Sequence, residues 1–192
     1  MFKYQPPMKK FTKAQCFAVI ERMTEGEQPS NLELSALLQQ FAPSAHAKPK
    51  TGFDWVKQAV AKKDVRSYLN TVYVNDGMAH GCDGRHLLIA PTDRDNGYYC
   101  PRTGQPVDES LKYPDIDRVK PKDTQPIDTP EPEYFFHGKE ERVRINGQIY
   151  QSIYFKRMLN MPSTEVNWFQ SITGLVCESD QGHYALILPL RQ

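Results

Sequence analysis

One order of elements, a helix followed by three strands, occurs twice in the 192 residues, and this repeat restricts the fold more than any other feature. In the first copy, residues 51–60 predict a helix and residues 67–90 predict three strands, with a strong hairpin signal at Asn75-Asp76-Gly77. In the second copy, a short strand at 142–145 precedes a predicted helix at 148–160 and three strands within 166–190. Each three-stranded meander has one apolar face to bury, and one helix can cover it.

We therefore expect an α+β fold, a two-layer domain built from two βαβββ halves that lie side by side and share a core. This domain is expected to cover residues 48–192. Residues 1–47 are expected to form a helical extension and linker, because Thr12 and Ser30 each open a capping box before an apolar stripe of helical spacing.

Residues 92–140 separate the two halves and read as irregular, because they are rich in proline and aspartate. A connector of this length is uncommon inside a compact domain. We expect either a flexible connector or a functional segment that packs locally around Tyr98, Tyr99 and Tyr113.

Composition limits the function classes. The chain has 24 basic and 23 acidic side chains, so its overall charge does not indicate a nucleic-acid-binding protein. The apolar runs are too short for a membrane span, and the N-terminus lacks the apolar stretch of a secretory signal. We expect a cytoplasmic protein without membrane contact, whose four cysteines are reduced thiols.

No pattern in the sequence indicates catalysis. The chain has no nucleophile elbow, phosphate-binding glycine loop or zinc-protease motif, so we expect no enzyme, no catalytic residue and no cofactor. A zinc site at His80, Cys82 and Cys100 was considered. The spacing lacks a clear fourth ligand, so the expectation is no metal.

Four segments resemble the bacterial DNA polymerase III beta subunit, the sliding clamp. Residues 63–70 (Lys-Asp-Val-Arg-Ser-Tyr-Leu-Asn) resemble the Asp-Val-Arg-Tyr-Tyr-Leu-Asn segment of the family. Residues 82–87 (Cys-Asp-Gly-Arg-His-Leu) are similar to its Thr-Asp-Gly-His-Arg-Leu hairpin, with Thr replaced and His and Arg exchanged. Residues 113–119 (Tyr-Pro-Asp-Ile-Asp-Arg-Val) resemble the Phe-Pro-Asp-Tyr-Arg-Arg-Val connector, and residues 184–192 resemble the terminal strand that ends Met-Pro-Met-Arg-Leu.

The resemblance is incomplete in one important respect. A family chain has several domains of this kind and closes a ring in pairs, whereas this chain has room for one domain. The likeness is also composite, because the first segments match the middle domain of the family and the last matches its final domain. A ring would need about six copies joined head to tail, and closure depends on a rotation that the sequence does not specify. A single-domain relative with an added helical extension suggests a protein encoded by a phage or another mobile element.

The resemblance implies two binding surfaces. The first consists of basic side chains on and beside the predicted helices, which would face the phosphates of duplex DNA. The alternative is that these side chains belong to ordinary solvated helix faces. The residues concerned are Lys57, Lys62, Lys63, Arg66, Lys156 and Arg157.

The second implied surface is a groove for short apolar peptides of replication proteins. Carried over position by position, its residues are Gly84, Arg85, His86, Leu87, Pro114, Arg118, Val119, Leu188, Pro189 and Leu190. The alternative is that the apolar members are core residues and that the exchange of His and Arg has abolished the groove. In the family the groove lies between neighbouring domains, so here it needs either two copies or reconstruction within one chain.

The leading functional hypothesis is a sliding-clamp-like processivity factor for DNA replication that self-associates and binds duplex DNA and replication-protein peptides without catalysis. The alternative is a clamp-fold interaction module that forms no ring and regulates a replication protein. The alternative follows from the sheet edges that a lone clamp domain would leave open to association.

Overall fold

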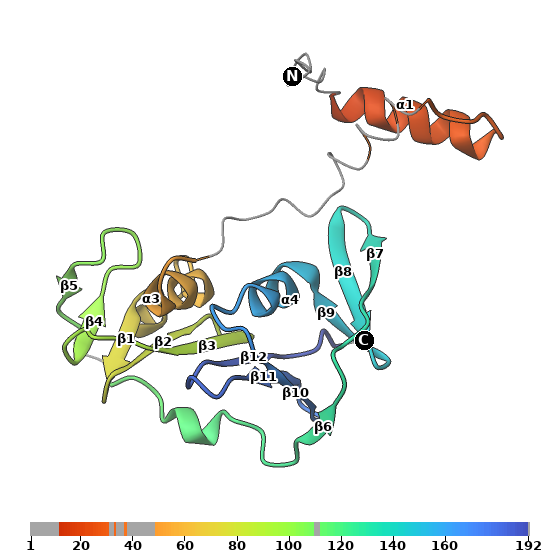
Figure 1. Ribbon diagram of the computed structural model, residues 1–192. Helices are drawn as coiled ribbons and strands as arrows, with labels where there is room; N and C mark the ends of the chain where they lie inside the picture. The colour runs from red at the N-terminus through yellow and green to blue at the C-terminus, as the bar shows by residue number, and fades with distance from the viewer. Residues whose placement is uncertain (1–11, 31–32, 34–36, 38–48, 110–111, 192) are drawn as a thin grey trace, which may run out of the picture. The chain divides into compact units, whose positions relative to one another are not determined.

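The computed structural model describes residues 12–30, 33, 37, 49–109 and 112–191, and the chain divides into two compact units, Met1–Ala47 and Lys48–Gln192 (Figure 1). None of the helices in the described residues is long and apolar enough to cross a membrane.

The first unit contains α1 (Lys13–Thr24), which begins at the predicted capping box. The Thr12 backbone N–H donates to Gln15 Oε1 at 2.8 Å, and the Gln15 N–H donates to Thr12 Oγ1 at 3.3 Å. A second box forms between Ser30 and Glu33, whose N–H groups each donate to the side chain of the other residue. Most of the second predicted helix lies outside the described residues.

The second unit contains two meanders that meet in the middle of one sheet. The first comprises β1 (Val72–Asn75), β2 (Met78–Cys82) and β3 (His86–Pro91), and the second comprises β10 (Asn167–Gln170), β11 (Leu175–Glu178) and β12 (Tyr184–Ile187). β3 pairs antiparallel with β12, with Leu87 opposite Leu186, so the meanders form one continuous sheet (Figure 1). The predicted pair of three-stranded meanders is confirmed.

Short strands of the connector, residues 92–140, extend the sheet at both of its outer edges. There β4 (Gly97–Tyr99) pairs with β1, β5 (Pro106–Val107) pairs with β4, and β6 (Gln125–Ile127) pairs with β10. The expectation that residues 92–140 are irregular is therefore wrong for these segments. Strands of two or three residues are too short to show an alternating pattern, and only pairing with the meanders reveals them.

The second half also begins differently from the prediction. Residues 148–151 form β9 (Gln148–Gln151), and α4 (Ser152–Leu159) starts only after it. β9 belongs to a separate three-stranded sheet with β8 (Glu140–Ile145) and β7 (Glu133–His137). The Asn146-Gly147 turn, with φ of 47° and 80°, directs the chain back along β8, and this pairing overrides the helical spacing of the apolar residues.

Two further strand predictions are corrected. Residues 67–70 form a 3-10 turn, η2 (Ser67–Asn70), and only the following residues enter β1. The apolar spacing of the sequence predicts Trp168 and Ile172 on one strand of the second meander, but Ile172 lies in the turn after β10 and is 83% exposed. Within the described residues, no strand precedes the helix α3 of the first half. The complete order βαβββ is therefore described only in the second half, where β9 precedes α4.

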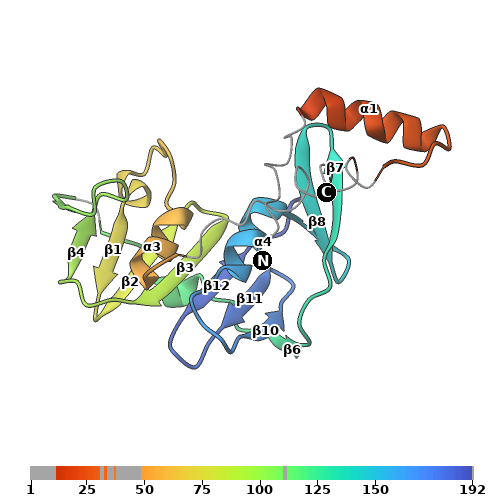
Figure 2. The same cartoon turned by 45° about the horizontal axis from the view of Figure 1, so that its top comes forward.

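Both helices cover the same face of the sheet. α3 (Gly52–Val56), extended by η1 (Lys57–Ala59), lies over the first meander, and α4 lies over the second (Figure 2). Trp55 is fully buried, and its Nε1–H donates to the carbonyl of Arg157 at 2.8 Å. This bond joins α3 to α4 above the line where the two meanders meet.

The other face of the sheet has its own apolar cluster. It is composed of buried Leu87, Ile89, Val176 and Leu186, and Ile116 of η3 (Ile116–Arg118) packs against it. The connector therefore covers part of the face that the helices leave open.

The close packing of α3 against β2 predicts the effect of one added methyl group. A Cβ at Gly81 would lie 2.4 Å from the carbonyl oxygen of Val56, so the helix would have to move. We expect Gly81→Ala to lower the free energy of unfolding by about 3 kcal/mol, measured by urea denaturation. Val65→Ala, at a side chain that is 99% exposed, should stay within about 0.5 kcal/mol. Equal midpoints for the two variants would contradict this packing.

Candidate functional site

A cavity of about 250 Å³ opens on the sheet face opposite the helices, where the β2–β3 turn, β12, η2 and the connector meet. We call it the groove. Its lining is mostly apolar and consists of Arg66, Tyr68, Leu69, Cys82, Gly84, Arg85, His86, Leu87, Pro114, Val119, Leu186 and Leu188. Seven of the ten predicted peptide-binding positions are in this set, namely Gly84, Arg85, His86, Leu87, Pro114, Val119 and Leu188.

The β2–β3 turn forms one wall of the groove. Asp83 Oδ1 accepts the backbone N–H groups of Arg85 and His86, each at 2.9 Å. Gly84 adopts a φ of 87°, which L-residues rarely take, so the turn requires glycine there. The turn thus determines which side chains of β3 face the helices and which face the opposite side of the sheet.

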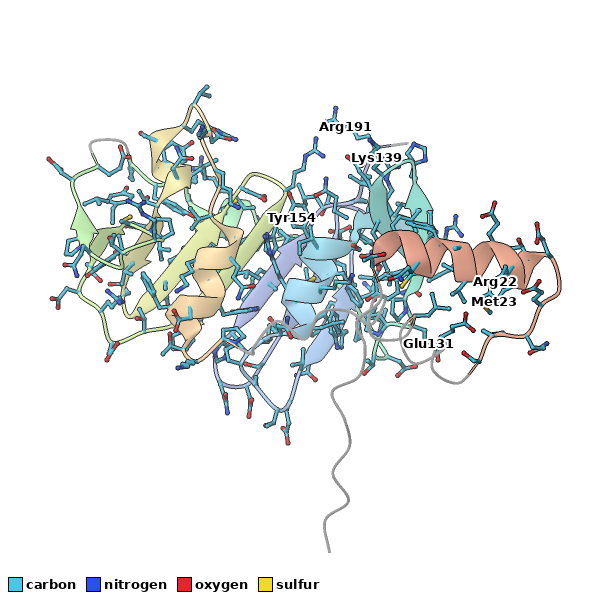
Figure 3. All side chains as sticks on the ribbon, turned by 90° about the horizontal axis from the view of Figure 1, so that it is seen from above. Arg22, Met23, Glu131, Lys139, Tyr154 and Arg191 are labelled. Carbon is cyan, nitrogen blue, oxygen red and sulfur yellow. The ribbon has the colours of Figure 1, made fainter. Side chains whose placement is uncertain are left out.

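The alternation on β3 explains why the exchange of His and Arg does not close the groove. Leu88 belongs to the helix-side core and Leu87 to the cluster on the opposite face, so His86, the first residue of β3, points toward the helices. Arg85 lies in the turn before β3, where it lines the groove, and its charge also acts on Tyr154 of α4. The His86 ring stacks on the Tyr154 ring, with centroids 4.9 Å apart. Tyr154 lies on α4, where Figure 3 labels it. Neither ring nitrogen of His86 has a hydrogen-bond partner among the described residues, and burial lowers the pKa of His86 well below its ordinary value.

Three predicted positions, Arg118, Pro189 and Leu190, lie outside the lining. The Leu188 N–H donates to the Arg85 carbonyl at 2.9 Å and so extends the β12–β3 pairing. The Leu190 N–H donates instead to the Ile149 carbonyl at 2.7 Å, which leads Pro189 and Leu190 away toward β9. Arg118 is exposed and pairs with Asp115 at 3.3 Å.

Five lining residues were not predicted as part of the groove. Tyr68 and Leu69 lie in η2, inside a segment that carries the family resemblance, and Cys82 ends β2. Leu186 precedes Leu188 by two positions, so strand alternation alone could have identified it. Arg66, the fifth, was assigned to DNA.

The connector is held beside the groove by an aromatic cluster. The buried Tyr113 ring stacks on Tyr73 at 4.7 Å, and the Tyr113 N–H donates to Tyr98 Oη at 2.9 Å. His80 borders this cluster, and burial lowers its pKa to about 4.

The local packing expected around Tyr98, Tyr99 and Tyr113 is present at Tyr98 and Tyr113, where it positions Pro114 at the groove. Tyr99 instead belongs to the helix-side core and contacts Phe53.

The basic residues expected to contact DNA do not form one unpaired surface. Lys57 pairs with Asp54 at 2.5 Å, and Lys156 on α4 pairs with Glu141. Arg66 pairs with Asp64 at 2.9 Å, and this ion pair and its hydrogen bonds lower the pKa of Asp64 to about 2.

The other three residues of that set differ from one another. Arg157 is half-buried, and burial lowers its pKa. Lys62 and Lys63 are exposed in the turn after η1. Three of the six cations are thus compensated by carboxylates within the domain.

The zinc ligands considered from the sequence do not gather. Cys82 lines the groove, whereas Cys100 follows β4 at the far end of the sheet. Across the described residues, no three His, Cys, Asp or Glu side chains are placed to hold a metal ion.

Comparisons with known proteins identify the fold. No family model and no curated protein sequence matches the chain. Among solved structures, the DNA polymerase sliding clamp of Pseudomonas aeruginosa aligns over 73% of this chain and 63% of its own, at 16% identity and a TM-score of 0.50. The sliding clamp of Bacillus subtilis aligns over 73% and 61% at 12% identity, and the beta sliding clamp of C. crescentus over 73% and 63% at 14%, both with a TM-score of 0.50.

These likenesses show that the chain has the sliding-clamp fold. The chain spans less than two thirds of the length of the clamps that it matches.

The buried imidazoles predict how stability depends on pH. The unfolded chain holds histidine near its ordinary pKa of about 6.5, so between pH 6.5 and 4 it binds more protons than the folded protein. Stability should therefore fall as the pH decreases through this window. His80 alone should account for about 2 kcal/mol between pH 7.5 and 5.0, measured by urea unfolding.

His80→Phe retains a ring in the aromatic cluster and removes the titrating group. It should lose about 2 kcal/mol less than wild type over the same interval. Asp64 does not contribute there, because its low pKa affects stability only at more acidic pH. An unchanged pH slope in His80→Phe would show that this imidazole is not buried as described.

Proposed function

We propose that this protein is a clamp-fold module that captures an extended peptide of a replication protein in the groove, with one complete groove in each chain. The observation that carries the proposal is that seven positions predicted from the family resemblance line a single cavity inside one chain. In the family such a groove lies between neighbouring domains, and here β3 and β12 bring its two sides together directly.

The size and lining of the groove suit a peptide. At about 250 Å³ it is smaller than the roughly 300–1,000 Å³ of sites that enclose a small-molecule ligand. Its leucines, Val119 and Pro114 offer apolar contacts to alternate side chains of an extended strand. The arginines at its edge can orient the peptide.

The sheet edges favour a module over a ring. The outermost strands of the nine-stranded sheet in the described part of the chain are β5 and β6, which are two and three residues long and contain Pro106 and Pro126. The separate three-stranded sheet has β7 at one edge, which is five residues long and has no proline. Proline has no N–H to donate, and short edge strands with proline resist further strand pairing. Ring closure by extension of the nine-stranded sheet therefore has little support, and a self-associating clamp on duplex DNA is the alternative.

The charge pattern supports the same choice. Lys57, Arg66 and Lys156 are each paired with a carboxylate of the domain, so contact with phosphates would have to displace that carboxylate. The groove requires no such rearrangement.

Peptide binding is tested with a fluorescein-labelled clamp-binding peptide of a bacterial DNA polymerase, followed by fluorescence anisotropy. We expect Val119→Glu to weaken binding at least about tenfold, because it places a charge in an apolar lining. Val107→Glu is the matched control, since Val107 on β5 is 37% exposed and Val119 is 42% exposed. Equal affinity of wild type and Val119→Glu would contradict the assignment.

The same complex can be located by thiol alkylation. Cys82 lines the groove and Cys100 lies beyond β4, and both are free and partly accessible. Bound peptide should slow alkylation of Cys82 and leave Cys100 unchanged. Protection of both thiols, or of neither, would place the peptide elsewhere.

The oligomeric state separates the module from the ring. Light scattering after size exclusion should give one chain mass, 22.1 kDa, because the edge prolines oppose strand pairing between copies. A mass of about six chains would instead support a ring joined head to tail.

A further inference from the structure

The edge strand β7 differs from the two edge strands of the nine-stranded sheet. It is the outer strand of the hairpin that it forms with β8, and within the described residues no strand pairs with its other side (Figure 1). It is five residues long and contains no proline, whereas β5 and β6 are shorter and each contain one. An edge of this kind can accept a further strand by backbone hydrogen bonding.

The hairpin turn determines which backbone groups of β7 are directed to its free side. Gly138, with a φ of 62°, begins a two-residue loop between the strands, so His137 flanks the loop. The residues that flank a two-residue loop form a hydrogen-bonded pair, and such pairs alternate along an antiparallel ladder. Tyr134 and Phe136 therefore direct their N–H and C=O groups away from β8. Among the described residues, neither of them makes a backbone hydrogen bond outside the strand pairing.

The side chains of β7 add an apolar surface to this edge. On one face Phe136 is 67% exposed and Tyr134 is 42% exposed, and the Lys156 ammonium lies 5.4 Å from the centre of the Tyr134 ring. Phe135 points to the other face, where the Arg144 guanidinium lies 5.2 Å from its ring centre. Three consecutive aromatic residues on an open edge are typical of an interaction surface.

The sequence of β7 is complementary to a second copy of itself. When Phe135 lies opposite Phe135 of the second copy, Tyr134 of each chain lies opposite Phe136 of the other. Every N–H and C=O group that these two residues direct outward then has a partner. In the same register the Glu133 carboxylate lies opposite the His137 imidazole, which can donate a hydrogen bond to it.

The neighbouring registers are less favourable. A shift of two residues in one direction places Phe136 opposite Pro132, which has no N–H to donate. A shift of two residues in the other direction places Tyr134 opposite Gly138, which lies in the turn. A shift of one residue places outward-directed backbone groups opposite groups that are already bonded to β8.

We propose that two copies of this chain associate by antiparallel pairing of β7 with β7, about a two-fold axis at Phe135. The contact joins identical surfaces and closes on itself, unlike the head-to-tail contact of a ring. It does not involve the groove and does not depend on the proposed function. Five residues of each chain take part, against roughly 20–30 in a stable interface, so we expect a Kd of about 0.1–1 mM. After dilution by size exclusion the protein is therefore a single chain.

The register is tested by disulfide trapping in the full chain, with the partly accessible Cys82 and Cys100 replaced by serine. Phe135→Cys places two thiols opposite each other in a non-hydrogen-bonded pair, where Cα atoms lie about 4.5 Å apart, within disulfide range. In Tyr134→Cys and Phe136→Cys the two copies of the thiol are diagonal neighbours, about 7–8 Å apart. At high protein concentration in a glutathione buffer, Phe135→Cys should give at least about tenfold more cross-linked dimer than either control.

The backbone pairing is tested by analytical ultracentrifugation of the full chain from about 10 µM to about 1 mM. The mass of wild type should rise from that of one chain, 22.1 kDa, toward that of two. Phe136→Pro removes an N–H that points away from β8, so it should keep the hairpin and weaken dimerisation at least about tenfold. Phe136→Val is the matched control, because it keeps the N–H and a β-branched side chain, and it should stay within about threefold of wild type.

A mixed sample gives a second check of the register. Glu133→Cys and His137→Cys should cross-link when they are mixed, whereas either variant alone should not. Equal trapping at positions 134, 135 and 136 would show random collisions and would overturn the proposal, as would a single chain mass at every concentration. A dimer that survives Phe136→Pro would show that the copies meet at another surface.

Discussion

The antiparallel pairing of β3 with β12 is the interaction on which the rest of the domain depends. It joins strands that lie roughly a hundred residues apart and converts two separate meanders into one sheet. On the helix side it places Leu88 opposite Ala185 beneath α3 and α4, where the Trp55 indole bonds to the end of α4. On the other side it places Leu87 opposite Leu186, and these two leucines line the groove. One pairing thus builds the core and the candidate site together.

Local chemistry in the sequence was sufficient for the turns and meanders. Asp76 and Gly77 adopt positive φ between β1 and β2, as an Asn-Asp-Gly segment requires, and α3 lies within the helix predicted at residues 51–60. What the sequence could not indicate depends on distant partners. β4 and β6 exist as strands because the meanders offer them an edge, and β9 pairs with β8 although its apolar residues fit a helix. Tertiary pairing overrides local preference in all of these cases.

The resemblance predicted seven of the twelve residues that line the groove, and it did not predict the geometry. The composite likeness, with early motifs similar to one domain of the family and the terminal motif to another, becomes understandable once β3 and β12 are neighbours. His86 illustrates what the linear motif conceals, since strand alternation on β3 places its ring against Tyr154 on the helix side. Arg66 was expected at DNA, and its pairing with Asp64 at the groove wall could be seen only in three dimensions.

The most direct test of the central claim is the stoichiometry of the complex by native mass spectrometry, with the polymerase peptide as probe. A groove completed within one chain predicts one peptide bound to a single 22.1 kDa chain, at concentrations where no dimer is present. A peptide retained only on dimers or larger assemblies would show that two chains are needed to form the site, and it would contradict the account.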